Sequence, residues 1–324
     1  MSKVTLVVTL VLALAASACS GGRHDPNEKF YLVAANIKLD YWQAAASGLT
    51  AAARQLGVQA EMVGPDSYDV QAERDAFRSA VAKKPAGILV NVADPAVLGP
   101  EIDSAIGQGI PVVAMDSDAP GSKRVTFIGT NNYEAGQMGG RALLKALNGK
   151  GKVVVYTMPG QANLDERLKG YQDAIKGSGV EIIQVINVKG DPRVAFDSTS
   201  EIINQGKIKP DGFVCLEEAS CKEVADVLDR NKVTGKTIVA MDTVKDTLDW
   251  IQKGVIAATI AQKPYTMAFY GVKVLDDIFH YKPQSLGVKF AEDTHSPYPV
   301  FIDTGATLVD KSNLAAFEAA QSAK

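Results

Sequence analysis

From residue 29 onward, short apolar runs alternate with amphipathic stretches of helical length. KFYLVAAN, VQAEMVG, AGILVNV and IPVVAMD are apolar runs of strand length. Between the first two lies YWQAAASGLTAAARQLG, in which Ala45, Leu49 and Ala52 fall on one helical face. Strands that are apolar along their whole length and separated by helices are typical of a parallel sheet covered on both faces. The first half of the chain is therefore predicted to form one α/β lobe.

The second half repeats this order of elements. KVVVYTM, EIIQVINV, DGFVCLE and KTIVAMD are strands with helical patterns between them, and VIAATIAQKP and a last long helix follow. IPVVAMD and KTIVAMD end in Asp116 and Asp242. Because ligands gather at the carboxyl ends of strands in open parallel sheets, two facing lobes would bring both carboxylates to one cleft. The alternative is a chance recurrence in which each Asp caps the following helix.

The first residues change the picture. MSKVTLVVTLVLALAASACSGG has an apolar core over 4–14, which is too short for a membrane-spanning helix of about 20 residues and is typical of a secretory signal. ASAC, which ends at Cys19, resembles the lipobox of bacterial lipoproteins, where the signal is cut before a Cys that then carries the lipid. We therefore expect a signal peptide over 1–18 and a tether over 19–28. Ala16 stands where Leu is usual, so secretion without lipid is the alternative.

Composition narrows the function further. A chain of 324 residues suits about two domains, and a net charge of −3 gives no electrostatic case for nucleic acid binding. Cys215 and Cys221 would form a disulfide in an oxidising compartment, or stay two separately buried thiols. Their C-x5-C spacing without a neighbouring His argues against zinc, so neither a metal nor a cofactor is expected.

No reactive constellation is visible in the sequence. His24, His280 and His295 lie in no nucleophile, metal or triad motif, so the protein is not expected to be an enzyme. GTNNYEAGQMGG is rich in Gly but lacks both phosphate-binding motifs. It is interpreted as a segment that crosses between lobes, followed by a closely packed helix. A transcription repressor of this architecture would begin with a helix-turn-helix, where this chain has a secretion signal.

Seven short motifs occur in an order that resembles a known family. They are the aromatic pair of LDYWQAA, the Asn of LVNVAD, IPVVAMD, FIGTNNYEAG, the R-x-x-G-aromatic of ERLKGY, the second VAMD and ATIAQKP. Together they resemble the periplasmic sugar-binding proteins of the ribose/galactose type, the solute receptors of bacterial ABC importers. The resemblance spans about 29–310.

The resemblance implies an α/β fold of two Rossmann-like lobes joined by a three-segment hinge that closes around ligand. The crossing segments are expected near 129–131, 261–263 and 303–305. The N-terminal lobe would then comprise 29–130 plus 263–303, and the C-terminal lobe 131–262 plus 304–324.

The same resemblance implies a set of ligand-binding residues. Tyr41 and Trp42 match aromatics that sandwich the sugar ring, whose apolar faces suit flat aromatic surface. The complete expected set is Lys38, Tyr41, Trp42, Asn91, Asp116, Ser117, Arg167, Glu218, Asp242 and Gln262. Carboxylates, amides and a guanidinium suit adjacent hydroxyls because each can hold two hydrogen bonds in one plane. A surface salt bridge for Arg167 and cap or loop roles for Asp242 and Gln262 are the alternatives.

Several positions depart from the family pattern. Ser117 follows Asp116 where many members have Arg, and Lys38, which either reaches the cleft or is solvated, stands where Asn is common. CLEEAS stands where the family usually has Asn-Asp at a strand end, which makes Glu217 or Glu218 a candidate ligand residue. Glu218 aligns best with the family position. Asp191 is a weak candidate where a second aromatic is usual.

The expected ligand-binding residues contain more acidic than basic side chains. Since a buried unpaired charge is costly, a neutral, hydroxyl-rich ligand is favoured. We expect a monosaccharide or small polyol, bound by a monomeric, membrane-anchored lipoprotein of the periplasm or outer cell surface that serves an ABC permease. A receptor for a signalling molecule or a nucleoside on the same fold is the alternative.

Overall fold

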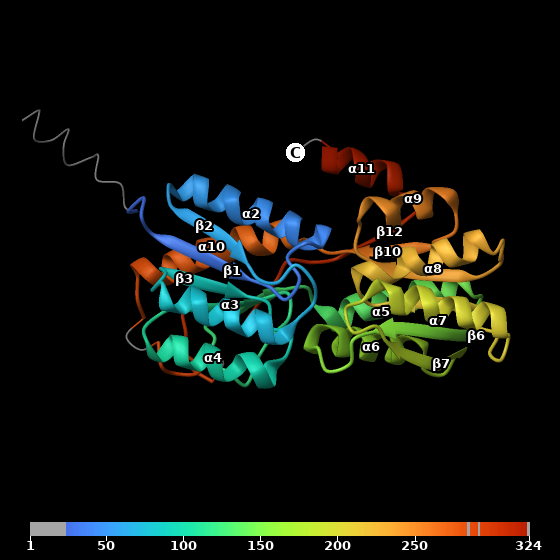
Figure 1. Ribbon diagram of the computed structural model, residues 1–324, viewed down its shortest axis with the longest axis horizontal. Coiled ribbons are helices and arrows are strands. Elements are labelled where there is room, and N and C mark those ends of the chain that lie inside the picture. The colour runs from blue at the N-terminus through green and yellow to red at the C-terminus, as the bar shows by residue number, and fades with distance from the viewer. Residues whose placement is uncertain (1–23, 284–285, 291, 323–324) are drawn as a thin grey trace, which may run out of the picture.

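The computed structural model describes residues 24–283, 286–290 and 292–322. The expected signal peptide, Cys19 and the first part of the tether lie outside the described residues. The chain forms two lobes that lie side by side along its long axis (Figure 1). Within the described ranges, no helix is both long and apolar enough to span a membrane.

The N-terminal lobe is built on a six-stranded parallel sheet in the order β11-β5-β4-β3-β1-β2. Its strands are β1 (Lys29–Val33), β2 (Gln59–Val63), β3 (Gly87–Val90), β4 (Val112–Met115), β5 (Phe127–Gly129) and β11 (Phe301–Asp303). Its helices are α2 (Asp40–Leu56), α3 (Val70–Ala82), α4 (Pro95–Gly107) and α10 (Pro264–His280). Helices α2 and α10 pack together on one face of the sheet, and α3 and α4 cover the other (Figure 1).

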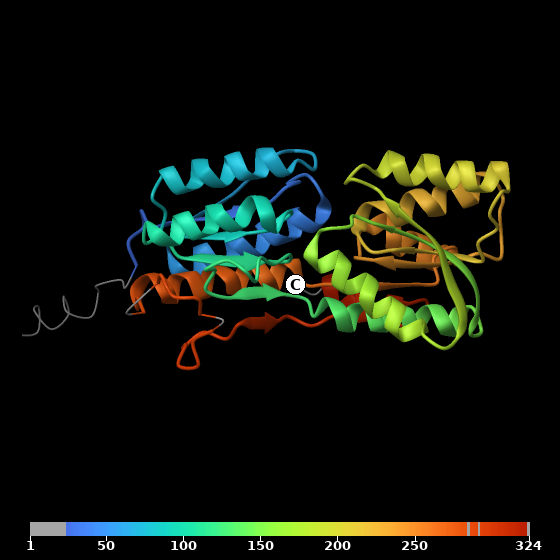
Figure 2. The same ribbon diagram turned by 90° about the horizontal axis from the view of Figure 1, so that it is seen from below.

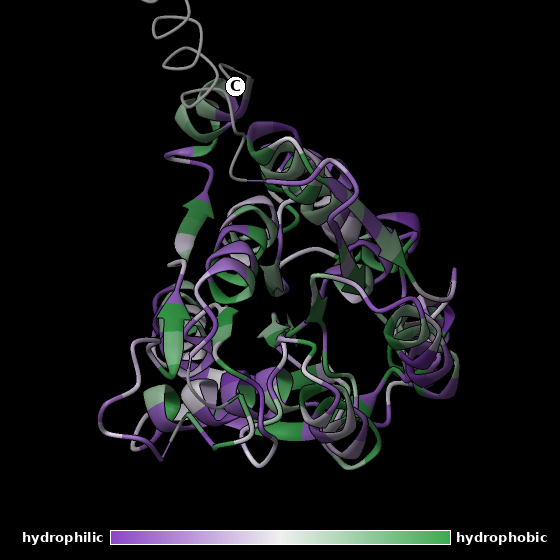
Figure 3. Ribbon diagram, turned by 90° about the vertical axis from the view of Figure 1, so that its left-hand side faces the viewer, coloured by the Kyte–Doolittle hydropathy of each residue, from purple (hydrophilic) through white to green (hydrophobic). Residues whose placement is uncertain are grey.

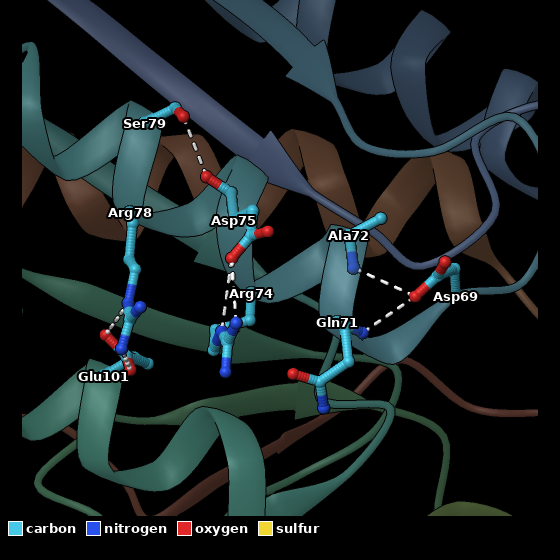
Figure 4. Close-up of polar contacts among 8 residues, drawn as sticks. All are labelled: Asp69, Gln71, Ala72, Arg74, Asp75, Arg78, Ser79 and Glu101. Atoms are coloured by element: carbon cyan, nitrogen blue, oxygen red, sulfur yellow. Dashed lines mark hydrogen bonds and ion pairs between the residues drawn. The ribbon is translucent and has the colours of Figure 1, made fainter.

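Local polar contacts fix where helix α3 begins and how it sits on α4. The Asp69 carboxylate caps α3 by accepting hydrogen bonds from the N–H groups of Gln71 and Ala72 (Figure 4). Further along α3, the Arg78 guanidinium donates two hydrogen bonds to the Glu101 carboxylate of α4. The cap fixes the start of α3 and the bidentate pair fastens the two helices to each other.

The C-terminal lobe repeats this design with the sheet order β12-β10-β9-β8-β6-β7, in which only the pairing of β12 with β10 is antiparallel among the described strands. Its strands are β6 (Lys150–Thr157), β7 (Gly179–Asn187), β8 (Gly212–Cys215), β9 (Thr237–Met241), β10 (Ala258–Ala261) and β12 (Thr307–Asp310). Its helices are α5 (Asn132–Ala146), α6 (Ala162–Ile175), α7 (Pro192–Gln205), α8 (Glu218–Arg230), α9 (Lys245–Lys253) and α11 (Leu314–Ser322).

The chain passes between the two sheets three times. It leaves the N-terminal sheet after β5 and enters α5, returns from β10 into α10, and leaves again from β11 to β12. Figure 2 shows these connections running between the lobes. Each lobe is therefore assembled from separate stretches of the chain, which explains why no flexible linker divides the sequence into halves.

Apolar strands form the core of each lobe. In β1, β3 and β4 the side chains of Leu32, Leu89 and Val113 are fully buried, because helices cover both faces of the sheet. Figure 3 shows strands in hydrophobic colours inside helices whose colours alternate. The polar side chains at the carboxyl ends of these strands are thus the ones left to face the other lobe.

Candidate ligand-binding site between the lobes

A cavity of about 220 Å³ lies between the two lobes. Its walls include residues that follow the strands of both sheets, such as Asn91 and Asp116 on one side and Glu217 and Asp242 on the other. Pockets for drug-sized molecules range from about 300 to 1,000 Å³. The cavity therefore suits a smaller ligand.

Asp116 and Asp242 occupy equivalent positions directly after β4 and β9. Each has a φ of 68°, a left-handed conformation that is uncommon outside Gly and that Asp tolerates better than most residues. The backbone N–H of Asp116 donates to Ile128 O at 3.0 Å, and that of Asp242 donates to Ile260 O at 2.9 Å. The two lobes thus present their carboxylates to the cavity with the same local geometry.

Asp116 is held by three hydrogen bonds. It accepts from the Tyr41 hydroxyl at 2.6 Å, from Asn91 Nδ2 at 3.1 Å and from Asn163 Nδ2 at 3.2 Å. Burial raises the pKa of Asp116, although the nearby Arg167 charge and the Tyr41 hydrogen bond lower it in part. Asn163 belongs to the C-terminal lobe, so its bond to Asp116 joins the lobes across the cavity.

Asp242 has fewer partners. Its carboxylate accepts one hydrogen bond from the described residues, from Gln262 Nε2 at 2.8 Å. Burial raises the pKa of Asp242 to about 6, against the opposing influence of Arg167. Because a carboxylate can accept about four hydrogen bonds, Asp242 keeps most of its capacity for a ligand.

Arg167 is a buried guanidinium bound only to neutral acceptors. It donates to Asn132 Oδ1 at 2.8 Å, to the Leu216 carbonyl at 2.7 Å and to Gln262 Oε1 at 2.8 Å. Within the described ranges it forms no ion pair. A guanidinium has five N–H groups, so two remain for a ligand.

Gln262 links the site to the crossing segments. Its Oε1 atom accepts from Arg167 and also from the Thr130 hydroxyl at 2.9 Å, while its Nε2 donates to Asp242. Thr130 lies between β5 and α5, and Gln262 between β10 and α10, so one amide connects two of the three crossings.

The loop between β8 and α8 brings two glutamates to the cavity. Glu218 Oε2 accepts a hydrogen bond from the Tyr41 N–H at 2.9 Å, which is a second bond between the lobes. Burial, with the Asp242 charge adding to it, raises the pKa of Glu218 to about 8. Glu217 instead caps α8 through the N–H groups of Ala219 and Ser220.

A disulfide joins the two sides of this loop. Cys215 is the last residue of β8 and Cys221 lies in the first turn of α8, with their Cα atoms 5.6 Å apart. The bridge spans the two glutamates and holds the loop that carries them against the sheet.

Two aromatic side chains open helix α2 at the cavity. Tyr41 and Trp42 both line it, and their rings meet edge-to-face with centroids 5.1 Å apart. Both are largely buried. They form an aromatic part of the cavity wall.

The structure brings most of the expected ligand residues together. Those that line the cavity are Tyr41, Trp42, Asn91, Asp116, Arg167, Glu218, Asp242 and Gln262.

Lys38 and Ser117, two members of the expected set, are not among the residues that line the cavity. The Lys38 side chain is 64% exposed and its ammonium lies 3.8 Å from Asp66. Ser117 is fully buried. Asp191, the weaker suggestion, caps α7 by accepting from the Arg193 N–H.

Asn163 was missed. It precedes Arg167 by four positions and therefore shares its face of helix α6. That spacing was a usable signal in the sequence. Gln161, Asn36 and Tyr68 also line the cavity and carried no comparable signal.

The chain is similar in sequence and structure to known sugar-binding proteins. The model of the periplasmic binding protein domain matches residues 30–282. GanP, a glucose-galactose binding protein from Geobacillus stearothermophilus, has a similar structure with a TM-score of 0.81 and 29% identity, covering 90% of this chain and 99% of GanP. AraP, an arabinose binding protein from the same organism, gives a TM-score of 0.73 and 32% identity over 90% of this chain and 99% of AraP. The xylose/arabinose-binding protein XylF of Sulfolobus acidocaldarius is 25% identical over 82% of this chain and 67% of its own length.

Proposed function

The chain belongs to the family of periplasmic binding protein domains, and from this premise we propose that its interlobe cavity binds a neutral pentose, hexose or small polyol. The protein is a sugar-binding solute receptor of the kind that serves ABC importers. Its family consists of non-enzymatic binding proteins, which confirms the expectation that it is not an enzyme.

The charges that line the cavity favour a neutral ligand over an anionic one. Six acidic residues line it, namely Asp40, Asp116, Glu217, Glu218, Asp242 and Asp246, against the basic residues Arg167, Lys222 and Lys245. The Arg167 charge lowers the pKa of Asp116 and of Asp242. An anionic ligand would add negative charge to a desolvated site in which acidic residues already outnumber basic ones, which is costly. A neutral ligand with several hydroxyls can donate to the carboxylates and accept from Arg167.

The relatives support the same class of ligand. GanP is described as a glucose-galactose binding protein, AraP as an arabinose binding protein and XylF as a xylose/arabinose-binding protein. A hexose has about twelve heavy atoms, which is compatible with a cavity of about 220 Å³.

Binding is proposed to proceed by closure of the lobes. The hydrogen bonds from Tyr41 to Glu218 and from Asn163 to Asp116 span the cavity in the present conformation. A ligand that touches both lobes would add to these bonds and so favour the closed form, which is the condition for a ligand to shift a conformational equilibrium.

Membrane attachment and delivery complete the proposal. Cys19, outside the described residues, would carry a lipid that anchors a monomeric receptor in the periplasm or at the outer cell surface. The membrane subunits of an ABC importer would receive the ligand from the closed form. Metabolic labelling with a palmitate analogue tests the anchor: the full-length chain should be labelled and Cys19→Ser should not.

Calorimetric titration of the protein lacking 1–19 tests the ligand. Arabinose, ribose, xylose, galactose, glucose and a pentitol are compared with a nucleoside and with glucose 6-phosphate. We expect tight binding of one neutral sugar or polyol and none of the phosphorylated sugar. Exclusive binding of the nucleoside would favour the alternative receptor function, and preference for the phosphorylated sugar would contradict the charge argument.

A further inference from the structure

Far from the cavity, two histidines and two carboxylates meet at the end of helix α10. They are His24, Glu28, Asp276 and His280, and 252 residues separate His24 from Asp276 in the sequence. Helix α10 starts at the crossing segment and has 17 residues, so its end lies about 25 Å from that start at the usual rise per residue. The group therefore belongs to a different region from the sugar site.

Asp276 is the centre of this cluster. Asp276 is largely buried, with 8% of its surface exposed. The His24 Nε2 atom lies 3.1 Å from both of its carboxylate oxygens, and His280 Nδ1 lies 3.2 Å from its Oδ1. Yet Oδ1 has no hydrogen-bond partner of acceptable geometry among the described residues. A buried carboxylate oxygen thus has two imidazole nitrogens close by, neither of them aimed at it as a hydrogen-bond donor.

We propose that His24, Asp276 and His280 bind a divalent transition-metal ion, with Zn²⁺ as the representative ion. The ligand atoms that these residues offer all lie within 4.8 Å of one another. Tetrahedral Zn²⁺ with bonds of about 2.0 Å holds its ligands a little over 3 Å apart, so small side-chain adjustments complete the arrangement. Imidazole and carboxylate are donors that Zn²⁺ accepts readily, and solvent supplies the fourth ligand.

Glu28 orients one of the ligands. Its Oε1 atom lies 3.2 Å from His280 Nε2, so Nε2–H donates to the carboxylate. The other ring nitrogen, Nδ1, lies 2.9 Å from the Asp276 backbone carbonyl oxygen and 3.2 Å from Asp276 Oδ1, and it would exchange the contact with the carbonyl for the ion on binding. A carboxylate that fixes the tautomer of a metal-binding His is the usual outer-shell arrangement of zinc sites.

The site would fasten the start of the chain to the body of the receptor. His24 lies five positions after Cys19, and α10 is the helix that returns to the N-terminal lobe from the second crossing. A bound ion would thus fix where the tether leaves the N-terminal lobe, whether or not Cys19 carries a lipid.

Titration calorimetry with ZnCl₂ on the metal-stripped protein starting at residue 20 tests the proposal. We expect one equivalent to bind, with affinity reduced at least 10-fold by His24→Ala and by His280→Ala. His295→Ala is the matched control, because His295 lies in an exposed loop and should bind zinc like the parent. Absence of zinc binding, or equal affinity in all three variants, would overturn the proposal and leave an ordinary ion-pair cluster.

Hydrogen exchange separates metal ligation from a folding defect. Zinc should slow amide exchange over 24–29 in the parent and in His295→Ala, and should leave His280→Ala unchanged. Sugar affinity should be the same in all these proteins, which shows that they are folded. Slowing of exchange in His280→Ala to the parental extent would contradict the assignment.

Discussion

Asp116 and Asp242 share a φ of 68° at corresponding strand ends, yet Asp116 accepts three hydrogen bonds from described side chains and Asp242 accepts one. The two lobes therefore use the same backbone geometry for different purposes. Asp116 is built into the framework that aligns Tyr41, Asn91 and Asn163. Asp242 retains acceptor capacity that is available to a ligand in the cavity.

Asp242→Asn is expected to weaken sugar binding by about 10- to 100-fold, because hydrogen bonds to a charged group contribute about 1.5–3 kcal/mol. Asn is chosen over Ala because it tolerates the left-handed conformation. Asp229→Asn, at an exposed position of α8, is the control and should bind as the parent does. Calorimetry measures both. Parental affinity in Asp242→Asn would remove Asp242 from the site.

Thermal stability of the unliganded protein is expected to fall as the pH rises from about 5 to about 8. Burial raises the pKa of Glu218 from 4.5 to about 8, so between these values the folded protein retains a proton that the unfolded chain releases. Stability is then lost as pH rises, the reverse of a salt-bridged carboxylate. Asp242, with a pKa of about 6, acts in the same direction over a lower range.

Glu218→Gln isolates the contribution of that residue, since Gln still accepts the Tyr41 N–H but does not titrate. Its Tm should fall less than that of the parent between pH 6 and pH 8. Parallel curves for the two proteins would mean that Glu218 is solvated when ionised.

Gly136→Ala is expected to lower the free energy of unfolding by about 1–3 kcal/mol through overpacking. A Cβ at this position would lie 2.1 Å from the Arg167 carbonyl oxygen of α6, so α5 and α6 would have to separate. Sugar affinity should fall as well, because Arg167 would move. Gly107→Ala has nothing within 4 Å of the added carbon and should be neutral or slightly stabilising. Denaturant unfolding compares the two.

Reduction of the disulfide is expected to destabilise the protein by about 2 kcal/mol, the value that loop-closure entropy gives for a short loop. Cys215 and Cys221 are six positions apart. Dithiothreitol should lower the Tm of the parent and leave that of the Cys215→Ala/Cys221→Ala double variant unchanged. An equal response in both would show that the bond contributes nothing.

The periodicity of the sequence predicted the repeated strand and helix order, because buried parallel strands are apolar throughout. It did not predict the short strands β5, β11 and β12. Of these, β11 and β12 form only where the third crossing pairs with a sheet edge. The twin Asp residues were found because they end the strands that the pattern marks most clearly.

Side-chain direction explains why Lys38, a member of the expected set, lies away from the cavity. Lys38 stands in a loop, where sequence sets no orientation, and it turns to Asp66. The fold also unites residues that no local motif connects, since His24 and Asp276 are brought together only when α10 returns to the N-terminal lobe. A motif search could not find such a cluster.

The Gln262 amide touches Asp242, Arg167 and Thr130 at once. A side chain that we propose contacts the ligand thus also joins two of the crossing segments. Any sugar that displaces or strengthens the bond to Asp242 changes the forces on two crossing segments directly. If Gln262 binds the ligand as proposed, ligand binding and the relative position of the lobes are coupled through this one side chain, without intermediate residues.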